Sequence, residues 1–214
     1  MDPPKEVTNV DRTPTGRSQR TGSDMPRIPY TDPTVYEPVF GPGASPAQQV
    51  FAHSPEIAQA YLAFGDTARR VGVLPFRLVE LVRLRVAFHN QCKLCMSLRY
   101  EDGDGAPVEE GLVCSLEQPY ETDRLSPAER AAIAFADKMA TDHLAIGDAM
   151  FEELRTHFTD AEVMELCFRV AANVGFGRMA AVLDVIPQED LPVGLRGAGV
   201  HAPWTAFAET SGAS

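Results

Sequence analysis

Apolar and polar positions follow a helical period through the middle of the chain. The run that begins at Ser54, with proline and glutamate directly after it, predicts a helix that continues to about Arg70, before Gly72. Pro75 opens a second predicted helix over 75–90, and the apolar majority of this run is typical of a buried element.

The second half of the chain carries the clearest helix starts. The runs 126–129 and 159–162 each place a hydroxyl residue three positions before a glutamate, which is the pattern of a capping box. They predict helices over 127–142 and 160–184, and a shorter helix is expected over 148–157. Because no tight hairpin turn separates alternating apolar runs, the fold class is predicted to be all-α.

Three segments outside this helical region have a different composition. Residues 1–24 are almost free of apolar side chains and are predicted to be disordered. Residues 25–46 contain six prolines and are predicted to form an extended arm that lies on an apolar surface. The tail over 187–214 is rich in glycine, proline and alanine and is predicted to be irregular, which leaves a helical domain over 47–186.

Charge and hydropathy then narrow the function classes. Of the 214 residues, 30 are acidic and 19 are basic, and this gives a formal charge of -11. No stretch gathers Lys and Arg into a stripe that could neutralise phosphates, so a nucleic-acid partner is not expected. Neither a signal peptide nor a run of about 18 apolar residues is found, so we expect a soluble, cytoplasmic protein with no membrane partner.

The main candidate for chemistry is a pair of cysteines within the run HNQCKLCMSLRY. If Asn90 caps a new helix, Cys92 falls in its first turn and Cys95 one turn later on the same face, so the two sulfurs can meet. The helix dipole and Lys93 are expected to lower the pKa of at least one thiol below its usual value of about 8.5. An acidified thiol is a nucleophile.

Two plainer interpretations of the pair remain open. A zinc site would need two more ligands at similar spacing, and Cys114 and Cys167 have no second CxxC or HxxxH around them. The pair could also be buried and inert, as we expect Cys114 and Cys167 to be. No metal and no cofactor are predicted.

A carboxylate and a guanidinium are predicted beside the thiols. If the chain reverses near Asn90, Glu80 and Arg99 come level across two antiparallel helices, and Arg99 lies one turn from Cys95. These groups would then form one cluster around the sulfur. The alternative is an ion pair that only joins the two helices.

The run ELVRLRVAFHNQCKLCMSLR, with Glu80 twelve residues before Cys92, resembles the alkylhydroperoxidase D / carboxymuconolactone decarboxylase family. The resemblance covers about residues 45–186 and implies the all-helical fold of that family, assembled as trimers or hexamers. In the peroxidase branch the motif reads Glu, CxxC and then His. Glu80, Cys92 and Cys95 match it, and Arg99 stands at the His position.

This departure limits the chemistry that the resemblance implies. Arginine stays protonated, so Arg99 could hold a thiolate but could not relay a proton, which would fall to Glu80, water or His89. The expected activity is that of a thiol peroxidase or disulfide oxidoreductase of the peroxiredoxin type. Cys95 attacks a peroxide or disulfide, Cys92 closes the disulfide, and an external dithiol such as a lipoyl protein reduces it.

Two other functions stay open. A lyase acting on a carboxylated lactone would hold the substrate carboxylate on Arg99, although the decarboxylase branch of the family lacks the CxxC. A non-catalytic oligomeric redox sensor would form the disulfide without turnover. Replacing both cysteines by serine separates the thiol enzyme from the lyase.

Overall fold

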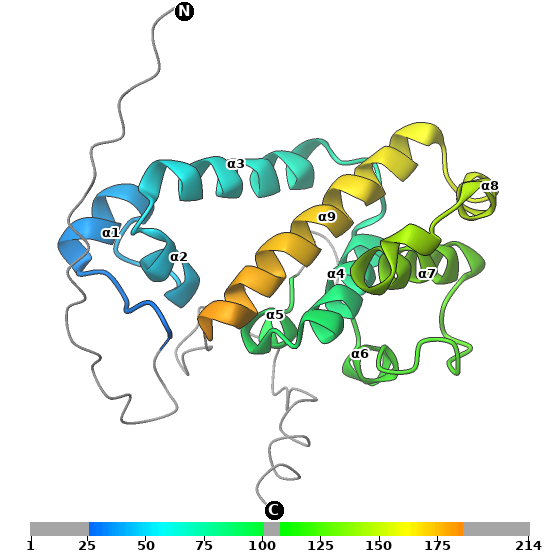
Figure 1. Cartoon of the computed structure of the whole chain (residues 1–214), viewed down its shortest axis with the longest axis horizontal. Helices are drawn as coiled ribbons and strands as arrows, with labels where there is room; N and C mark the ends of the chain where they lie inside the picture. The colour runs from blue at the N-terminus through cyan, green and yellow to red at the C-terminus, as the bar shows by residue number, and fades with distance from the viewer. Residues whose placement is uncertain (1–25, 101–107, 186–214) are drawn as a thin grey trace, which may run out of the picture.

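A computed structural model describes residues 26–100 and 108–185, and within them it contains helices and no strand (Figure 1). This confirms the predicted all-α class. The elements are α1 (Pro33–Phe40), α2 (Pro46–Phe51), α3 (Pro55–Val71), α4 (Phe76–Asn90), α5 (Lys93–Ser97), α6 (Glu110–Ser115), α7 (Pro127–Thr141), η1 (His143–Ala145), α8 (Asp148–Arg155) and α9 (Asp160–Leu183).

Helix α4 is the centre of the fold. It packs against α9 on one side and α7 on the other, and α5 follows it directly (Figure 1). Its apolar residues therefore belong to two separate core clusters: Val82 and Val86 lie in the one shared with α7 and α9, whereas Leu81 and Leu84 lie in the one closed by α6. A helix that is apolar on most sides is buried on most sides, as its sequence predicted.

The predicted capping boxes are confirmed. Ser126 and Glu129 satisfy each other's backbone amides at the start of α7, and Thr159 and Glu162 do the same at the start of α9. Each box removes two of the unpaired amides of a helix start, so the sequence predicted these two boundaries to the residue. The helix predicted to begin at Pro55 does so, and the helix predicted over 75–90 begins at Phe76, with Pro75 as its N-cap residue.

The extended arm predicted over 25–46 is wrong for much of its length, because α1 forms within it and α2 begins at its end. Pro33 and Pro46 each occupy the first turn of a helix, where the missing amide costs nothing. Asp32 and Ser45 precede them as capping residues whose side chains accept backbone N–H groups. The segments 1–24 and 187–214 lie outside the described residues.

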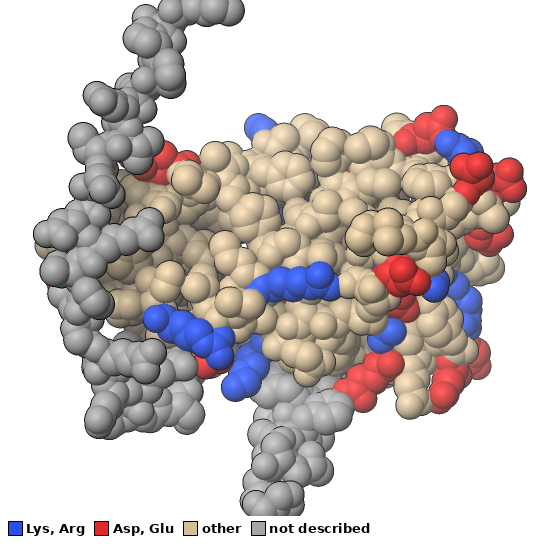
Figure 2. Space-filling view, viewed as in Figure 1, with Lys and Arg blue, Asp and Glu red and all other residues tan. Residues whose placement is uncertain are grey.

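Helices α3 and α9 carry an unusual number of exposed apolar side chains. Only Ala58 is buried in α3, although the helix has 17 residues. Figure 2 shows the face over these two helices largely free of charge, with acidic side chains gathered mainly towards the α8 end. By length and hydropathy α9 alone, among the described helices, could span a membrane, and it also packs against α4, α5 and α7.

Candidate redox site

The two cysteines of the CxxC are joined at the turn between α4 and α5. Helix α4 ends at Asn90, and Gln91 reverses the chain in a left-handed conformation with φ 50°. Cys92 then caps α5, and its sulfur accepts the N–H of Cys95 at 3.2 Å. The sulfurs form a disulfide with the Cα atoms 5.2 Å apart. The predicted meeting of the sulfurs is confirmed, but Asn90 is not the cap, and Cys92 precedes the helix rather than lying in its first turn.

The two sulfurs differ in access. Cys92 is 0% exposed and packs in a cluster with Val50 and Leu94. Cys95 is half-buried and lines a cavity, which Cys92 does not. An incoming molecule therefore meets Cys95 first.

Glycine at position 177 allows α9 to approach this turn. A Cβ there would lie 2.5 Å from the Asn90 side-chain nitrogen and 3.9 Å from the Cys95 sulfur. Asn90 itself joins the helices, since its amide donates to the Asn173 carbonyl at 2.9 Å and its oxygen accepts from Arg178 at 3.1 Å. The absence of a side chain at Gly177 thus leaves the space that the Asn90 amide occupies between α4 and α9.

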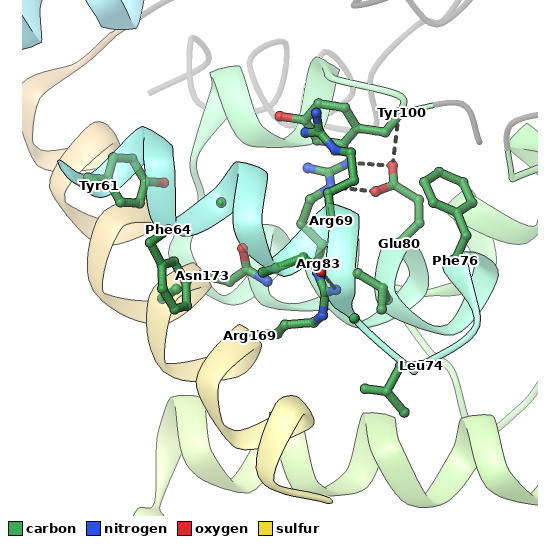
Figure 3. Close-up of a pocket in the computed structure, with 15 residues that line it drawn as sticks. Tyr61, Phe64, Arg69, Leu74, Phe76, Glu80, Arg83, Tyr100, Arg169 and Asn173 are labelled. Carbon is green, nitrogen blue, oxygen red and sulfur yellow. Dashed lines mark hydrogen bonds and ion pairs between the residues drawn. The ribbon is translucent and has the colours of Figure 1, made fainter. Parts of the chain in front are cut away.

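Glu80 pairs with Arg83 and not with Arg99. Both oxygens of Glu80, which is 2% exposed, accept from the Arg83 guanidinium at 2.6 Å, and one also accepts the Tyr100 N–H at 3.3 Å (Figure 3). The same guanidinium donates to the carbonyls of Cys95 at 2.7 Å and Leu98 at 2.8 Å. Arg83 therefore ties the carboxylate on α4 to the backbone that carries the reactive sulfur.

The electrostatic balance favours charge on Arg83. Burial opposes the cation, but the attraction and the hydrogen bonds of Glu80 outweigh it and raise the pKa of Arg83. This residue was missed from the sequence. A signal was present, because Glu80 and Arg83 are three apart on a predicted helix and so share a face.

Arg99 lies elsewhere, which overturns the predicted cluster. Helix α5 ends at Ser97, so Arg99 is not one helical turn from Cys95. Its side chain is 1% exposed, pairs with Glu110 at 2.7 Å and donates to the Met96 carbonyl at 2.5 Å. Arg99 lines neither cavity described below, so it can hold neither a thiolate nor a substrate carboxylate there.

Two adjoining cavities, each about 360 Å³, lie between α3, α4 and α9. They share Tyr61, Arg69, Arg83, Tyr100 and Asn173, so they form parts of one cleft, which we call the thiol cleft. The part beside Cys95 has two arginines and no acidic residue among its described lining. Its apolar walls include Phe51, Leu62, Leu94, Leu98, Phe176 and Ala180.

His89 faces away from the thiols. Its Nε2 lies 2.6 Å from Asp137, which also accepts from Arg85 at 2.6 Å and from the Tyr120 hydroxyl at 2.7 Å. Burial works against the charge on Asp137, but the hydrogen bonds from His89, Arg85 and Tyr120 prevail and lower its pKa to about 2. His89 thus belongs to a network between α4 and α7.

The remaining cysteines are not buried as predicted. Cys114 is exposed and Cys167 is partly exposed, where burial raises the thiol pKa. Among the described residues, no group of three or more His, Cys, Asp or Glu side chains is arranged to hold a metal.

Comparison with solved structures shows which known proteins share this fold. An uncharacterized peroxidase-related protein from Ralstonia eutropha, described as an alkylhydroperoxidase AhpD core, matches 78% of this chain and 94% of its own, with a TM-score of 0.61 and 20% identity. The debrominase Bmp8 matches 66% of this chain and 76% of its own, with a TM-score of 0.55 and 18% identity. The chain has the alkylhydroperoxidase D fold, as the resemblance predicted.

Sequence comparison adds relatives without a known activity. Two uncharacterized proteins from different strains of Mycobacterium tuberculosis are 32% identical over 124 residues, which is 56% of this chain. The match spans 43% of the length of these relatives. No protein-family profile matches the chain.

Proposed function

We propose that this protein is a thiol-dependent oxidoreductase that reduces a peroxide or a disulfide through Cys95 and Cys92. The observation that carries the proposal is the asymmetry of the pair. One sulfur lines a cleft, and the other is fully buried within bonding distance of it. Attack requires an accessible sulfur, and resolution requires a neighbour that external reagents do not reach first.

The proposed cycle has two steps at the protein. The Cys95 thiolate attacks a peroxide oxygen, an S–O bond forms, the O–O bond breaks, and the departing oxygen takes a proton to leave as an alcohol or water. The Cys92 thiol then displaces water from the sulfenic acid to form the disulfide. An external dithiol, such as a lipoyl-bearing protein, returns the pair to two thiols and is itself oxidised.

Glu80 and Arg83 position the reacting sulfur in this proposal. The hydrogen bonds of Glu80 with Arg83 and Tyr100 all come from N–H donors, as suits an ionised carboxylate, so Glu80 anchors Arg83 rather than carrying a proton. Arg83 holds the Cys95 carbonyl and places a positive charge beside the segment that bears the sulfur. Arg99 has no catalytic role in this scheme.

The test is turnover with defined variants. We expect the reduced protein to consume hydrogen peroxide or cumene hydroperoxide with dihydrolipoamide as reductant. Cys95→Ser should abolish turnover, and Cys92→Ser should stop the cycle at a Cys95 sulfenic acid or mixed disulfide that mass spectrometry detects. Cys114→Ser is the control, because its thiol is exposed but lies outside the cleft. A double Cys92→Ser, Cys95→Ser variant that still consumed peroxide at the parent rate would overturn the proposal. A variant that consumed no peroxide but decarboxylated a carboxylated lactone would favour the lyase.

The non-catalytic sensor is separated by a different outcome. A sensor forms the disulfide with one equivalent of oxidant, shows no sustained consumption with any dithiol, and changes its assembly on oxidation. Light scattering of the reduced and oxidised protein measures that change. The cleft beside Cys95 favours the enzyme, because a sensor needs no space for a substrate body.

We also propose a cytoplasmic homo-oligomer, a trimer or a hexamer, formed through α3 and α9. Ile57 and Phe64 of α3 and Phe168 and Val182 of α9 are exposed apolar residues, and the two phenylalanines are in edge contact at 6.4 Å. Copies that each carry a charge of -11 repel one another, so association is least opposed through a face with few acidic side chains (Figure 2). Phe64→Glu with Phe168→Glu should yield a monomer in light scattering, whereas a change on α8 such as Glu152→Gln should not.

A further inference from the structure

The charges that line the thiol cleft contrast with those of the whole chain. The chain has 30 acidic and 19 basic residues, yet the described lining beside Cys95 contains Arg69 and Arg83 and no Asp or Glu. The adjoining part of the cleft adds Arg169 and Glu80. The part of the cleft beside Cys95 thus has two cations and no acidic residue in its described lining, which suits a negative ligand.

The arginines of the cleft differ in whether a carboxylate neutralises them. Arg83 is paired with Glu80, and Arg169 is paired with Glu165 at 2.5 Å. Within the described part of the chain, Arg69 has no carboxylate partner, and its guanidinium forms a cation–π contact with Tyr100, 5.6 Å from the centre of the ring (Figure 3). Arg69 is therefore the cation whose charge stays available to a ligand.

The position of Arg69 is fixed relative to the sulfur. Tyr100 lies against both guanidinium groups, with that of Arg83 4.9 Å from the ring. Arg83 in turn donates to the Cys95 carbonyl at 2.7 Å. A continuous set of contacts thus runs from Cys95 through Arg83 and Tyr100 to Arg69 on α3, on the exposed side of the cleft.

Apolar and aromatic groups occupy the space between. The rings of Tyr61 and Phe176 are stacked with centroids 3.6 Å apart, and Leu94 and Leu98 form the wall beside the sulfur. These groups suit the apolar body of an organic molecule and give small, fully hydrated oxidants nothing to bind. The lining of the cleft therefore fits a molecule with an apolar body and a negative group at one end.

We propose that the thiol cleft selects an anionic organic substrate, a carboxylate-bearing hydroperoxide or disulfide, with Arg69 receiving the carboxylate while Cys95 attacks the peroxide or disulfide bond. This inference rests on the proposed thiol function and adds the substrate class to it. Arginine can bind a carboxylate through two parallel N–H donors, which also fixes the direction of the substrate. Arg69 is a binding residue in this scheme and takes no part in bond breaking.

Two disulfide reagents test this charge selection without requiring turnover. Dithiobis-nitrobenzoate carries two carboxylates, whereas dithiodipyridine is neutral. In either reaction the Cys95 thiolate forms a mixed disulfide and releases one aryl thiolate, and the Cys92 thiol then releases the second, gives its proton to solvent and closes the protein disulfide. The background is the full chain with Cys114→Ser and Cys167→Ser, so that only the site thiols react.

The variant is Arg69→Gln, and the matched control is Arg70→Gln. Arg70 is the next residue of α3, is exposed and lines neither cavity, so both changes remove the same charge from the molecule. We expect Arg69→Gln to slow the reaction with the dianionic reagent about 5-fold, the effect of about 1 kcal/mol for one partly screened charge. The rate with the neutral reagent should stay within about twofold of the parent rate, and added salt should remove the difference.

The outcomes separate this inference from the proposed function. If Cys95→Ser leaves both reagents reacting at the parent rate, the thiol function itself fails. If both reactions depend on Cys95 but Arg69→Gln and Arg70→Gln slow the dianionic reagent equally, the thiol function stands and anion selection by the cleft is overturned. A fatty-acid hydroperoxide that turned over no faster than its methyl ester would also overturn the substrate class.

Discussion

Two arginines on α4 share nearly the same burial and have different surroundings. Arg83 and Arg85 are 12% and 13% exposed, and each forms an ion pair with a carboxylate at 2.6 Å and donates to backbone carbonyls. Arg83 holds the segment of the reactive sulfur beside an open cleft. Arg85 belongs to a closed network that joins α4 to α7. Burial and ion pairing therefore do not distinguish a site from a structural contact, and the neighbouring sulfur and cleft do.

The largest expected effect comes from removing each arginine in turn. Arg83→Met leaves the Glu80 carboxylate buried with a single backbone N–H donor, so we expect the free energy of unfolding to fall by about 3 to 5 kcal/mol. Arg85→Met should cost less, because Asp137 keeps its contacts with His89 and Tyr120. Urea denaturation measures both values.

Thiol reactivity then shows which arginine belongs to the site. Arg83→Met removes a cation near Cys95 and leaves a carboxylate without its partner, so reaction with the neutral disulfide reagent should slow about 10-fold. Arg85→Met should leave this rate within about twofold of the parent rate. If Arg83→Met does not fold, Arg83→Lys takes its place. Lysine keeps the positive charge, so this variant should slow the reaction by less than the 10-fold expected for methionine. Equal slowing by the two Met variants would contradict the comparison.

Replacement by alanine is expected to have opposite effects on stability at two glycines of α9. A Cβ at Gly177 would meet Asn90 at 2.5 Å, whereas a Cβ at Gly175 would meet nothing within 4 Å. Gly177→Ala must displace the Asn90 amide, which joins α4 to α9, so we expect a loss of about 1 to 3 kcal/mol and an altered rate at Cys95. Gly175→Ala should stabilise the helix by up to about 1 kcal/mol. Thermal unfolding measures both, and destabilisation by the Gly175 change alone would show that α9 packs differently.

Local features of this protein were predictable, because neighbouring residues decide them. The capping boxes at Ser126 and Thr159 and the close sulfurs of the CxxC follow from spacing along one helix or turn. The missed helix α1 had a similar local signal, since Asp32 followed by Pro33 is a good helix start. The count of prolines hid that signal.

Partners across helices were not predictable from register alone. Pairing Glu80 with Arg99 assumed that a helix runs on past Cys95, but α5 ends at Ser97 and Arg99 turns to Glu110. Counting residues from the turn predicts neighbours only while both segments are helical, so the count that placed Arg99 level with Glu80 failed beyond the end of α5. The pair of Glu80 and Arg83, three residues apart on α4, did have a local signal. The surroundings of Arg69 and Arg99 depend instead on how separate helices and loops meet, which no local pattern contains.

The smallest expected effect is the pH dependence of the network on the α7 side. Because the folded-state pKa of Asp137 is lowered from 3.8 to about 2, its ionised form contributes stability that is present above about pH 4. That contribution is lost as the pH falls through this interval towards 2, and protonation then breaks the pairing with Arg85 and His89.

We expect this loss to be about 1 to 2 kcal/mol, since water partly screens the group. Asp137→Asn cannot ionise, so the difference in unfolding free energy between the parent and this variant should shrink between pH 5 and about 2. Urea denaturation across that range measures it, and Asp148→Asn on α8, an exposed carboxylate outside the network, is the control. The thiol rate at neutral pH should be the same in the parent and in Asp137→Asn, because the network lies on the side of α4 away from the cleft. A slower thiol rate in Asp137→Asn would mean that the two sides of α4 are coupled. The claim that Arg83 affects the thiols and Arg85 does not would then be contradicted.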